Sequence, residues 1–184
     1  MDLQSKLTHL IESDHFLMSV IKTVEQLQLN DAWVAAGVIR NKVWDDLHNI
    51  QTNINDVDVI YYDASDLSIQ TEKALESKLK KWMPNQPWSV KNQARMHVKN
   101  NVSPYLSSFD GVAHFPETAT AIAVRLINNE LELMAPYGLT DLFEGRVKPT
   151  SPYKKGSKLH PIYLNRIQNK QWHTIWSNLK IEFE

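Results

Sequence analysis

The sequence predicts one α/β or α+β domain in which helices cover a β-sheet. Apolar segments of strand type alternate with amphipathic helical segments along the chain. No repeat, linker or low-complexity tract divides the 184 residues, a length that suits one domain with a substantial core. Hydrophobic residues make up 42% and charged residues 22%, so a globular rather than a disordered chain is expected.

Composition also excludes several kinds of protein. The absence of cysteine excludes a disulfide framework, a thiolate zinc site and a cysteine nucleophile, and it fits a reducing compartment. The formal net charge of −1 gives no overall attraction to nucleic acid or to anionic membranes. No apolar run approaches the ~20 residues of a membrane span, and the N-terminal segment lacks the pattern of a signal peptide. We therefore expect a cytoplasmic protein.

The N-terminal half predicts elements in the order helices, strand, helix, strand, helix. Apolar residues recur at helical spacing before residue 30, where Ser13-Asp14 can cap a second helix. The run Trp33-Val34-Ala35-Ala36 predicts a buried strand that enters a tight turn at Gly37. The later elements are a helix over 40–47, a loop over 50–55, a strand over 57–62 and a helix over 71–81 that ends before Pro84 and Pro87.

The C-terminal half gives a less regular pattern. Residues 88–97 are interpreted as a strand that opens into a loop, and residues 107–115 as a short helix. The apolar runs 120–127 and 131–134 predict a β-hairpin, because the Asn128-Asn129 pair between them tolerates the positive φ of hairpin turns. A loop over 148–157 and a mostly helical segment over 159–179 complete the chain.

The chemically informative segment is Asp56-Val57-Asp58. Alternate residues of a strand point to the same face, so two carboxylates would lie side by side. Such a pair repels and is costly to bury unless a cation lies between its members. Hard oxygen ligands suit Mg²⁺ or Mn²⁺. The alternative interpretation is a strand end that carries two solvated aspartates.

A strand–glycine–helix junction precedes this pair by about twenty residues, at Ala36-Gly37. Glycine allows backbone N–H groups to approach a phosphate closely, and the N-terminus of a helix favours anions. Arg40 would then bind a phosphate oxygen with its planar guanidinium. The alternative is a turn glycine beside a surface arginine.

Strand, glycine and helix followed by Asp-hydrophobic-Asp resemble the signature of the polymerase-β-like nucleotidyltransferase superfamily. Within it, the chain is most similar to a bacterial nucleotidyltransferase-like family of about this length. The resemblance runs from about residue 33 to the C-terminus, through motifs at 37–45, 56–63, 90–97, 116–121 and 135–142. It implies an α+β fold, a mixed β-sheet flanked by helices. The single domain 1–184 would have a helical N-terminal extension (1–30), a core (about 31–147) and a C-terminal helical segment (about 158–184).

The resemblance also implies an activity, the transfer of a nucleotidyl group from an NTP to a hydroxyl acceptor. Asp56 and Asp58 would bind Mg²⁺ or Mn²⁺, while Gly37, Arg40 and Asn41 would hold the nucleotide. The superfamily usually places Gly or Ser after the first glycine, but here that residue is Val38, and the interval from Gly37 to Asp56 is longer than usual.

The third carboxylate of the superfamily pattern is also missing, since residues 88–97 contain no acid. Glu117 follows Pro116 at an expected element boundary and is the candidate replacement. Asp63, Asp110 and Asp141 are further candidates.

A polar cluster, Asn92, Gln93, Arg95 and His97, has two interpretations. It is either a recognition rim in which Asn92 and Arg95 bind the nucleotide, or a hydrogen-bonded network that anchors loops. His97 is also a candidate general base, because the pKa of histidine suits that role.

Several other side chains are assigned to structure rather than chemistry. Arg125 lies in an apolar strand and should be paired with Glu117, Glu132 or Asp141. We expect four tryptophans in the core, namely Trp33, Trp44, Trp172 and Trp176.

Two functions other than catalysis fit the same residues. The fold could serve as a catalytically weak or inactive nucleotide-binding or protein-interaction module, because fold alone does not fix function. An RNA-interaction protein would use the cluster over 92–97 and the Lys154-Lys155 loop, although the near-neutral charge does not favour a long nucleic acid. The acceptor, the preferred nucleotide and the oligomeric state do not follow from the sequence.

Overall fold

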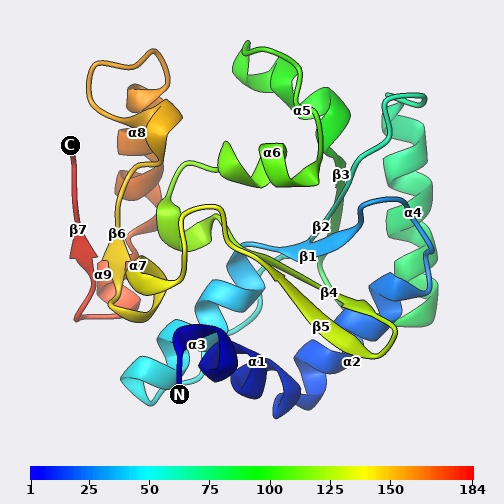
Figure 1. The fold of residues 1–184 in the computed structure, drawn as a ribbon, viewed down its shortest axis with the longest axis horizontal. Coiled ribbons are helices and arrows are strands. Elements are labelled where there is room, and N and C mark those ends of the chain that lie inside the picture. The colour runs from blue at the N-terminus through cyan, green and yellow to red at the C-terminus, as the bar shows by residue number, and fades with distance from the viewer.

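A five-stranded mixed β-sheet organises the fold, which Figure 1 shows as a computed structural model that describes residues 1–184, the side chain of Asn100 excepted. The strand order is β3-β2-β1-β4-β5. Strand β1 is antiparallel to both β2 and β4, β2 is parallel to β3, and β4 is antiparallel to β5. The strands are β1 (Trp33–Ala35), β2 (Val57–Tyr61), β3 (Trp88–Asn92), β4 (Ala123–Ile127) and β5 (Glu130–Met134).

Nine α-helices and two 3-10 turns are seen in the described residues, and the expected mixed sheet flanked by helices is confirmed. None of these helices has the length and apolar character that a membrane span requires. The helices are α1 (Leu3–Glu12), α2 (His15–Glu25), α3 (Gly37–His48), α4 (Ile69–Trp82), α5 (Gln93–Asn100), α6 (Ser108–Ala113), α7 (Thr140–Phe143), α8 (His160–Lys170) and α9 (Trp172–Ile175); the turns are η1 (Thr118–Thr120) and η2 (Ser151–Tyr153).

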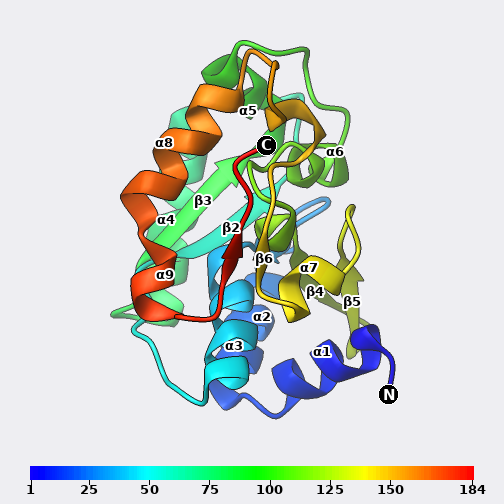
Figure 2. The same ribbon diagram turned by 90° about the vertical axis from the view of Figure 1, so that its left-hand side faces the viewer.

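The two faces of the sheet are covered unequally. Figures 1 and 2 show α1, α2 and α3 on one face and α5 and α6 on the other. Val57, Val59 and Tyr61 belong to the large hydrophobic core, which includes residues of α1 to α4. Ile60 belongs instead to a small cluster with Val112 of α6. Because this second cluster is small, part of the second face remains free to form a cleft.

Tryptophans attach the C-terminal segment to the core. Trp44 of α3 meets Trp172 and Trp176 edge to face, with ring centroids 5.7 and 5.2 Å apart. The indole N–H groups are satisfied as well, since Trp44 donates to the carbonyl of Leu142 at 3.1 Å and Trp176 to Oδ1 of Asp45 at 2.9 Å. These three tryptophans and Trp33 are buried, as the sequence predicted.

Strand β3 lies at one edge of the sheet, and α4 covers that edge with two carboxylates. Glu76 accepts a hydrogen bond from the N–H of Val90 at 3.1 Å, and Glu72 accepts one from the N–H of Asn92 at 2.8 Å. Both glutamates are buried. Arg95 binds Glu72 with two hydrogen bonds, of 2.6 and 3.0 Å. Backbone donors that a neighbouring strand would otherwise bind are therefore satisfied by side chains.

Several local predictions are confirmed. Asp14 accepts a hydrogen bond from the N–H of Leu17 at 3.0 Å, and so caps a second N-terminal helix. Asn128 and Asn129 have φ of 52° and 66° in the turn between β4 and β5. Arg125 pairs with Glu132 at 2.6 Å, one of its three expected partners.

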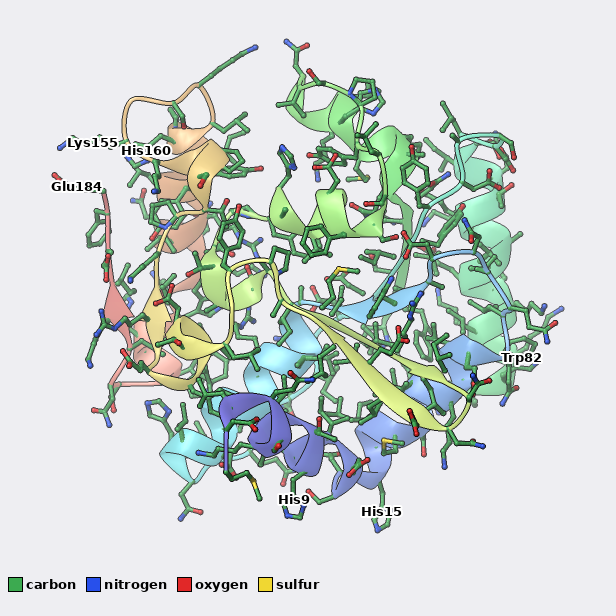
Figure 3. All side chains as sticks on the ribbon, viewed as in Figure 1. His9, His15, Trp82, Lys155, His160 and Glu184 are labelled. Carbon is green, nitrogen blue, oxygen red and sulfur yellow. The ribbon has the colours of Figure 1, made fainter. Side chains whose placement is uncertain are left out.

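The prediction of a loop after β3 is wrong, because residues 93–100 form helix α5. The side chain of Asn92 accepts a hydrogen bond from the N–H of Ala94 at 3.1 Å and begins this helix. A parallel pair of short strands, β6 (Arg146–Val147) and β7 (Lys180–Ile181), is not predicted by the sequence pattern. In the C-terminal region, the exposed Lys155 pairs with Glu184 at 2.5 Å (Figure 3).

Candidate active site

Asp58 lies on β2, on the face of the sheet away from the large core. It is preceded by the exposed Asp56, one residue before the strand begins, and followed by Ile60 of the small cluster. Its partner across the parallel pair is Ser89 of β3. Alternation along the strand thus directs Asp58 toward the partly covered face, as the Asp-x-Asp pattern predicted.

The environment of Asp58 disfavours the ionised form of its carboxyl group. Burial raises the pKa of the Asp58 carboxyl, and the negative charge of Asp56 raises it further. A hydrogen bond from the Ser89 hydroxyl and the charges of Arg166 and Lys91 oppose this shift. A carboxylate whose ionisation is opposed by burial and by a neighbouring negative charge is a place where a bound cation would be stabilising.

Replacement of Asp58 by asparagine should stabilise the metal-free protein at neutral pH. Folding raises the pKa of Asp58, so ionisation of this carboxyl opposes folding. The penalty is absent below the unfolded-state pKa of 3.8, appears as the pH rises above that value, and is complete above the folded-state pKa. We expect Asp58→Asn to raise Tm by a few degrees at pH 7 in EDTA and not near pH 4. Asp46→Asn is the control, because Asp46 is exposed. An equal rise in the Tm of Asp58→Asn at both pH values would contradict this account.

A side chain at position 37 would crowd the carboxylate of Asp56. A Cβ atom added to Gly37 would lie 3.2 Å from Oδ1 of Asp56 and 3.8 Å from Nη2 of Arg40. The residue with unusual backbone angles is its neighbour Ala36, with φ 55° and ψ −109°. The positive φ of the strand-to-helix turn therefore falls on an alanine, which is a strained conformation for that residue.

A cleft of about 390 Å³ opens beside Asp58. Strands β2 and β3 contribute Asp58 and Ser89, while α5, α6 and α8 bring side chains from other parts of the chain. Three cations line the cleft, Lys91, Lys99 and Arg166. Of these, Lys91 already pairs with Glu76 of α4 at 3.4 Å. Asp58 is the one acid among its described lining residues. A cleft with this charge suits an anionic ligand that carries a cation with it.

Aromatic and imidazole rings form another part of the cleft wall. Tyr105 and His114 lie with ring centroids 4.7 Å apart at an angle of 32°. Tyr153 and Phe115 also line the cleft. Flat apolar surfaces beside cations are the lining that a nucleotide base and its phosphates would need.

Arg40 is buried behind Gly37 and does not belong to the cleft lining. Its guanidinium lies 4.5 Å from the ring centroid of Trp172 and 5.1 Å from that of Trp44, and it donates to Oδ1 of Asn41 at 2.7 Å. Burial lowers the pKa of Arg40 to about 10, and the charge of Glu117 counteracts that shift. Arg40 therefore remains protonated at neutral pH, as a charge beneath the site.

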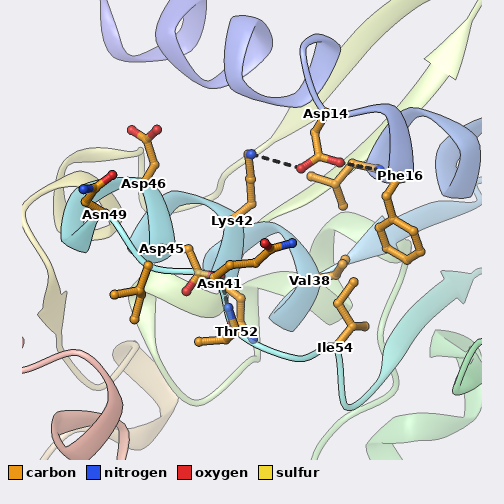
Figure 4. A pocket seen from close by; sticks show the side chains of 13 residues that line it. Asp14, Phe16, Val38, Asn41, Lys42, Asp45, Asp46, Asn49, Thr52 and Ile54 are labelled. Atoms are coloured by element: carbon orange, nitrogen blue, oxygen red, sulfur yellow. Dashed lines mark hydrogen bonds and ion pairs between the residues drawn. The ribbon is translucent and has the colours of Figure 1, made fainter.

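Asn41 lines a second cavity of about 420 Å³ on another part of the surface (Figure 4). An ion pair between Lys42 and Asp14, 3.0 Å long, crosses this cavity. The structure thus places the predicted nucleotide-binding residues Arg40 and Asn41 outside the cleft that contains Asp58.

Asn92 and Arg95 also point away from the cleft. The Asn92 side chain is fully buried and binds the N–H of Asp63, the carbonyls of Asp63 and Asp66, and the N–H of Ala94. Arg95 is held by Glu72. Of the two interpretations of this polar cluster, these contacts favour the structural network. His97 stacks edge-on against Tyr105 at 6.4 Å.

Glu117 is fully buried and paired with Arg166, at 2.6 Å between Oε1 and Nε. The other acids considered have partners elsewhere: Asp63 accepts from Ser65, Asp110 accepts from Leu106, and Asp141 pairs with Lys148.

The site offers part of the ligand set that a magnesium or manganese ion needs. Asp56 and Asp58 supply two hard oxygen ligands that repel each other without a cation. Within the described residues, no group of three or more His, Asp or Glu side chains gathers to hold a metal. Such an ion would therefore take its other oxygens from phosphate and water, as Mg²⁺ commonly does.

Comparison with known proteins identifies the family. The chain belongs to the family described as Nucleotidyltransferase, which matches residues 22–181. A solved structure described as "The NMR structure of the protein reveals a CCA-adding enzyme head domain" is 31% identical, with a TM-score of 0.87, over 97% of this chain and 95% of that chain. The resemblance found in the sequence is thereby confirmed, and both similarities support nucleotidyl transfer in general. Among curated proteins, none matches significantly.

Larger enzymes share the fold alone. An apo CCA-adding enzyme is 13% identical with a TM-score of 0.56, and the Thermotoga maritima CCA-adding enzyme complexed with tRNA is 17% identical with a TM-score of 0.54. The similarity covers 96% and 97% of this chain but 42% of each enzyme. The chain thus spans less than half the length of these enzymes.

Proposed function

We propose that this protein transfers a nucleotidyl group from an NTP to a hydroxyl acceptor in a reaction that depends on Mg²⁺ or Mn²⁺. The observation that carries the proposal is the position of Asp58 in the wall of a cleft with three cations, with the charge of Asp56 close to it. Membership in the nucleotidyltransferase family supports the reaction class. Asp56 and Asp58 would hold the metal ion, and the bound nucleotide would occupy the cleft.

Each part of the chain has a separate task in this proposal. Asp58 is kept in place by Ser89 and by the strand beneath it, while Gly37 leaves room for Asp56. Lys91, Lys99 and Arg166 would bind phosphate oxygens and orient the α-phosphorus toward an acceptor. When bound, the metal ion would neutralise charge on the triphosphate and on the leaving pyrophosphate.

The acceptor hydroxyl would belong to a small molecule, a protein side chain or an RNA end. One neighbouring fold is a CCA-adding enzyme complexed with tRNA, which supports an RNA end as one candidate. The overall charge of −1 places any attraction for RNA in the local cations of the cleft rather than in the whole surface.

The second candidate is a nucleotide-binding module that turns over slowly or not at all. It is favoured by the absence of an acid from β3, where the residues beside Asp58 are Ser89 and Lys91. Both carboxylate oxygens of Glu117 accept hydrogen bonds, from Arg166 and Thr120, which leaves the predicted replacement acid committed to other partners.

Titration with ATP, GTP, CTP and UTP, with and without Mg²⁺, tests the proposal. We expect wild type to bind at least one NTP in a Mg²⁺-dependent manner, and the double variant Asp56→Asn/Asp58→Asn to lose that dependence. Asp46→Asn is the matched control, because Asp46 is an exposed aspartate outside the cleft. Binding that is absent, or indifferent to metal and to the double substitution, would sink the proposal. Transfer from a labelled NTP then separates an enzyme from a binding module.

A further inference from the structure

Glu117 has an environment unlike that of a metal ligand. Its carboxylate is fully buried beside η1, and an isolated β-bridge between Glu117 and Pro149 fixes its backbone. Oε1 accepts a hydrogen bond from Nε of Arg166, and Oε2 accepts one from the hydroxyl of Thr120, both 2.6 Å long. These contacts commit the buried carboxylate to an arginine and a hydroxyl rather than to a metal ion.

Arg166 comes from α8, 49 residues beyond Glu117, and reaches the same cleft as Asp58. An arginine has five N–H donors, of which Nε is used by Glu117. No other hydrogen bond from Arg166 is found within the part of the chain that the structure describes. About a third of the side chain is exposed, so the outer guanidinium nitrogens are available to a ligand in the cleft.

A second arginine lies under this pair. Arg40 is held between the rings of Trp44 and Trp172, and the Arg166 guanidinium is 5.6 Å from the same Trp172 ring. Glu117 is the strongest of the charged neighbours that favour protonated Arg40. One buried carboxylate therefore balances two arginines, and the arrangement retains an excess positive charge that faces the metal-binding aspartates.

We propose that Arg166 is the residue that binds the triphosphate of the nucleotide, and that Glu117 is a positioning residue that holds Arg166 rather than the missing third metal ligand. The inference rests on the proposed function, because it assigns roles within the same cleft. Because Glu117 uses only Nε, the two Nη groups of this cleft-lining arginine are left to bind two phosphate oxygens at once. The positively charged residue that completes the site thus comes from the C-terminal helical segment.

The test compares binding of ATP, AMP and inorganic tripolyphosphate by isothermal titration, in EDTA and in Mg²⁺. The variants are Arg166→Gln, Arg166→Lys, Glu117→Gln and the double variant Glu117→Gln/Arg166→Gln. Arg125→Gln is the matched control, because Arg125 also pairs with a glutamate at 2.6 Å and lies over a tryptophan ring, at 4.0 Å from Trp33, but outside the cleft.

Arg166→Gln should lower the affinity for ATP and for tripolyphosphate at least about tenfold. The affinity for AMP should fall much less, since in this proposal the lost donors bind the distal phosphates. Arg166→Lys should restore part of the affinity. Glu117→Gln should also lower the affinity for ATP. The double variant should bind ATP no more weakly than Arg166→Gln, because Glu117 acts through Arg166. The double variant also removes both charges of the pair together, which keeps the fold testable if Glu117→Gln alone is unstable.

Binding of Mn²⁺ without nucleotide separates the two roles of Glu117. We expect Mn²⁺ affinity to fall in Asp58→Asn and to stay at the wild-type value in the double variant. A loss of Mn²⁺ affinity in the double variant comparable to that of Asp58→Asn would overturn the inference. Mg²⁺-dependent ATP binding that Arg166→Gln leaves unchanged would overturn it while the proposed function stands. If wild type binds neither ATP nor tripolyphosphate, the inference about Arg166 and the proposed function both fail.

Discussion

Truncation of Trp44 to alanine is expected to lower the free energy of unfolding by about 3–5 kcal/mol, the usual cost of removing a large buried aromatic side chain. The Trp44 ring is fully buried and contacts Trp172 and Trp176. Its N–H bond to the Leu142 carbonyl would also be lost. Because the C-terminal segment packs on α3 through this contact, we expect the truncation to loosen α9 as well. Urea denaturation followed by circular dichroism measures the change.

Two further substitutions separate the causes of that loss. Trp44→Phe retains an aromatic ring and removes the indole N–H, so it should cost about 1–3 kcal/mol. Trp82→Ala is the control, since Trp82 is partly exposed at the end of α4 and should cost less than about 1 kcal/mol. Equal destabilisation by Trp44→Ala and Trp82→Ala would show that the tryptophan cluster does not attach the C-terminal segment.

Replacement of Asn92 by alanine is the second substitution expected to have a large effect, a loss of about 3–5 kcal/mol. The side chain satisfies two backbone N–H groups and two carbonyls. A fully buried group left unpaired costs about 1–3 kcal/mol. The groups of Asp63 and Asp66 are only partly buried and each costs less, because water replaces part of the lost hydrogen bond. Asn92→Asp should destabilise the protein less than Asn92→Ala, because its carboxylate still accepts hydrogen bonds from the two N–H groups. It should remain less stable than wild type, because the carboxylate repels the carbonyls of Asp63 and Asp66.

The same substitution decides between the two interpretations of the polar cluster. If Asn92 belongs to a structural network, Asn92→Ala lowers stability, while folded protein keeps its affinity for NTP. If Asn92 recognises the nucleotide, affinity falls with little change in the urea midpoint. Asn169→Ala on α8 is the control, because the Asn169 side chain is exposed and bonds only Asn165 among the described residues.

The sequence predicted best those features that depend on neighbouring residues. The alternation of Asp56 and Asp58 predicts a strand with carboxylates on one face, and the Asn128-Asn129 pair predicts a hairpin. The error after β3 has a local cause as well. Asn92 both ends the strand and caps α5, and a polar residue within a polar run gives no sign of that second role.

The cleft could not be predicted in the same way, because its residues come from separate elements. Lys91, Lys99 and Arg166 belong to β3, α5 and α8, and no spacing in the sequence relates them. The position of Glu117 after Pro116 makes it a candidate for the missing third acid, but its partner Arg166 is found only from the fold. The two-residue strands β6 and β7, which pair across more than thirty residues, are too short to leave a periodic pattern.

The carboxylates of Glu72 and Glu76 have a consequence for how this protein behaves at high concentration. An edge strand normally offers its amide groups to any extended peptide nearby, including another copy of the same chain. Here the outward amides of Val90 and Asn92 already bind side chains of α4. Intermolecular strand addition at β3 would require both glutamates to leave their partners and to expose Arg95 without its counter-ion. The sheet is therefore protected from self-association along this edge strand, which itself carries Ser89 and Lys91.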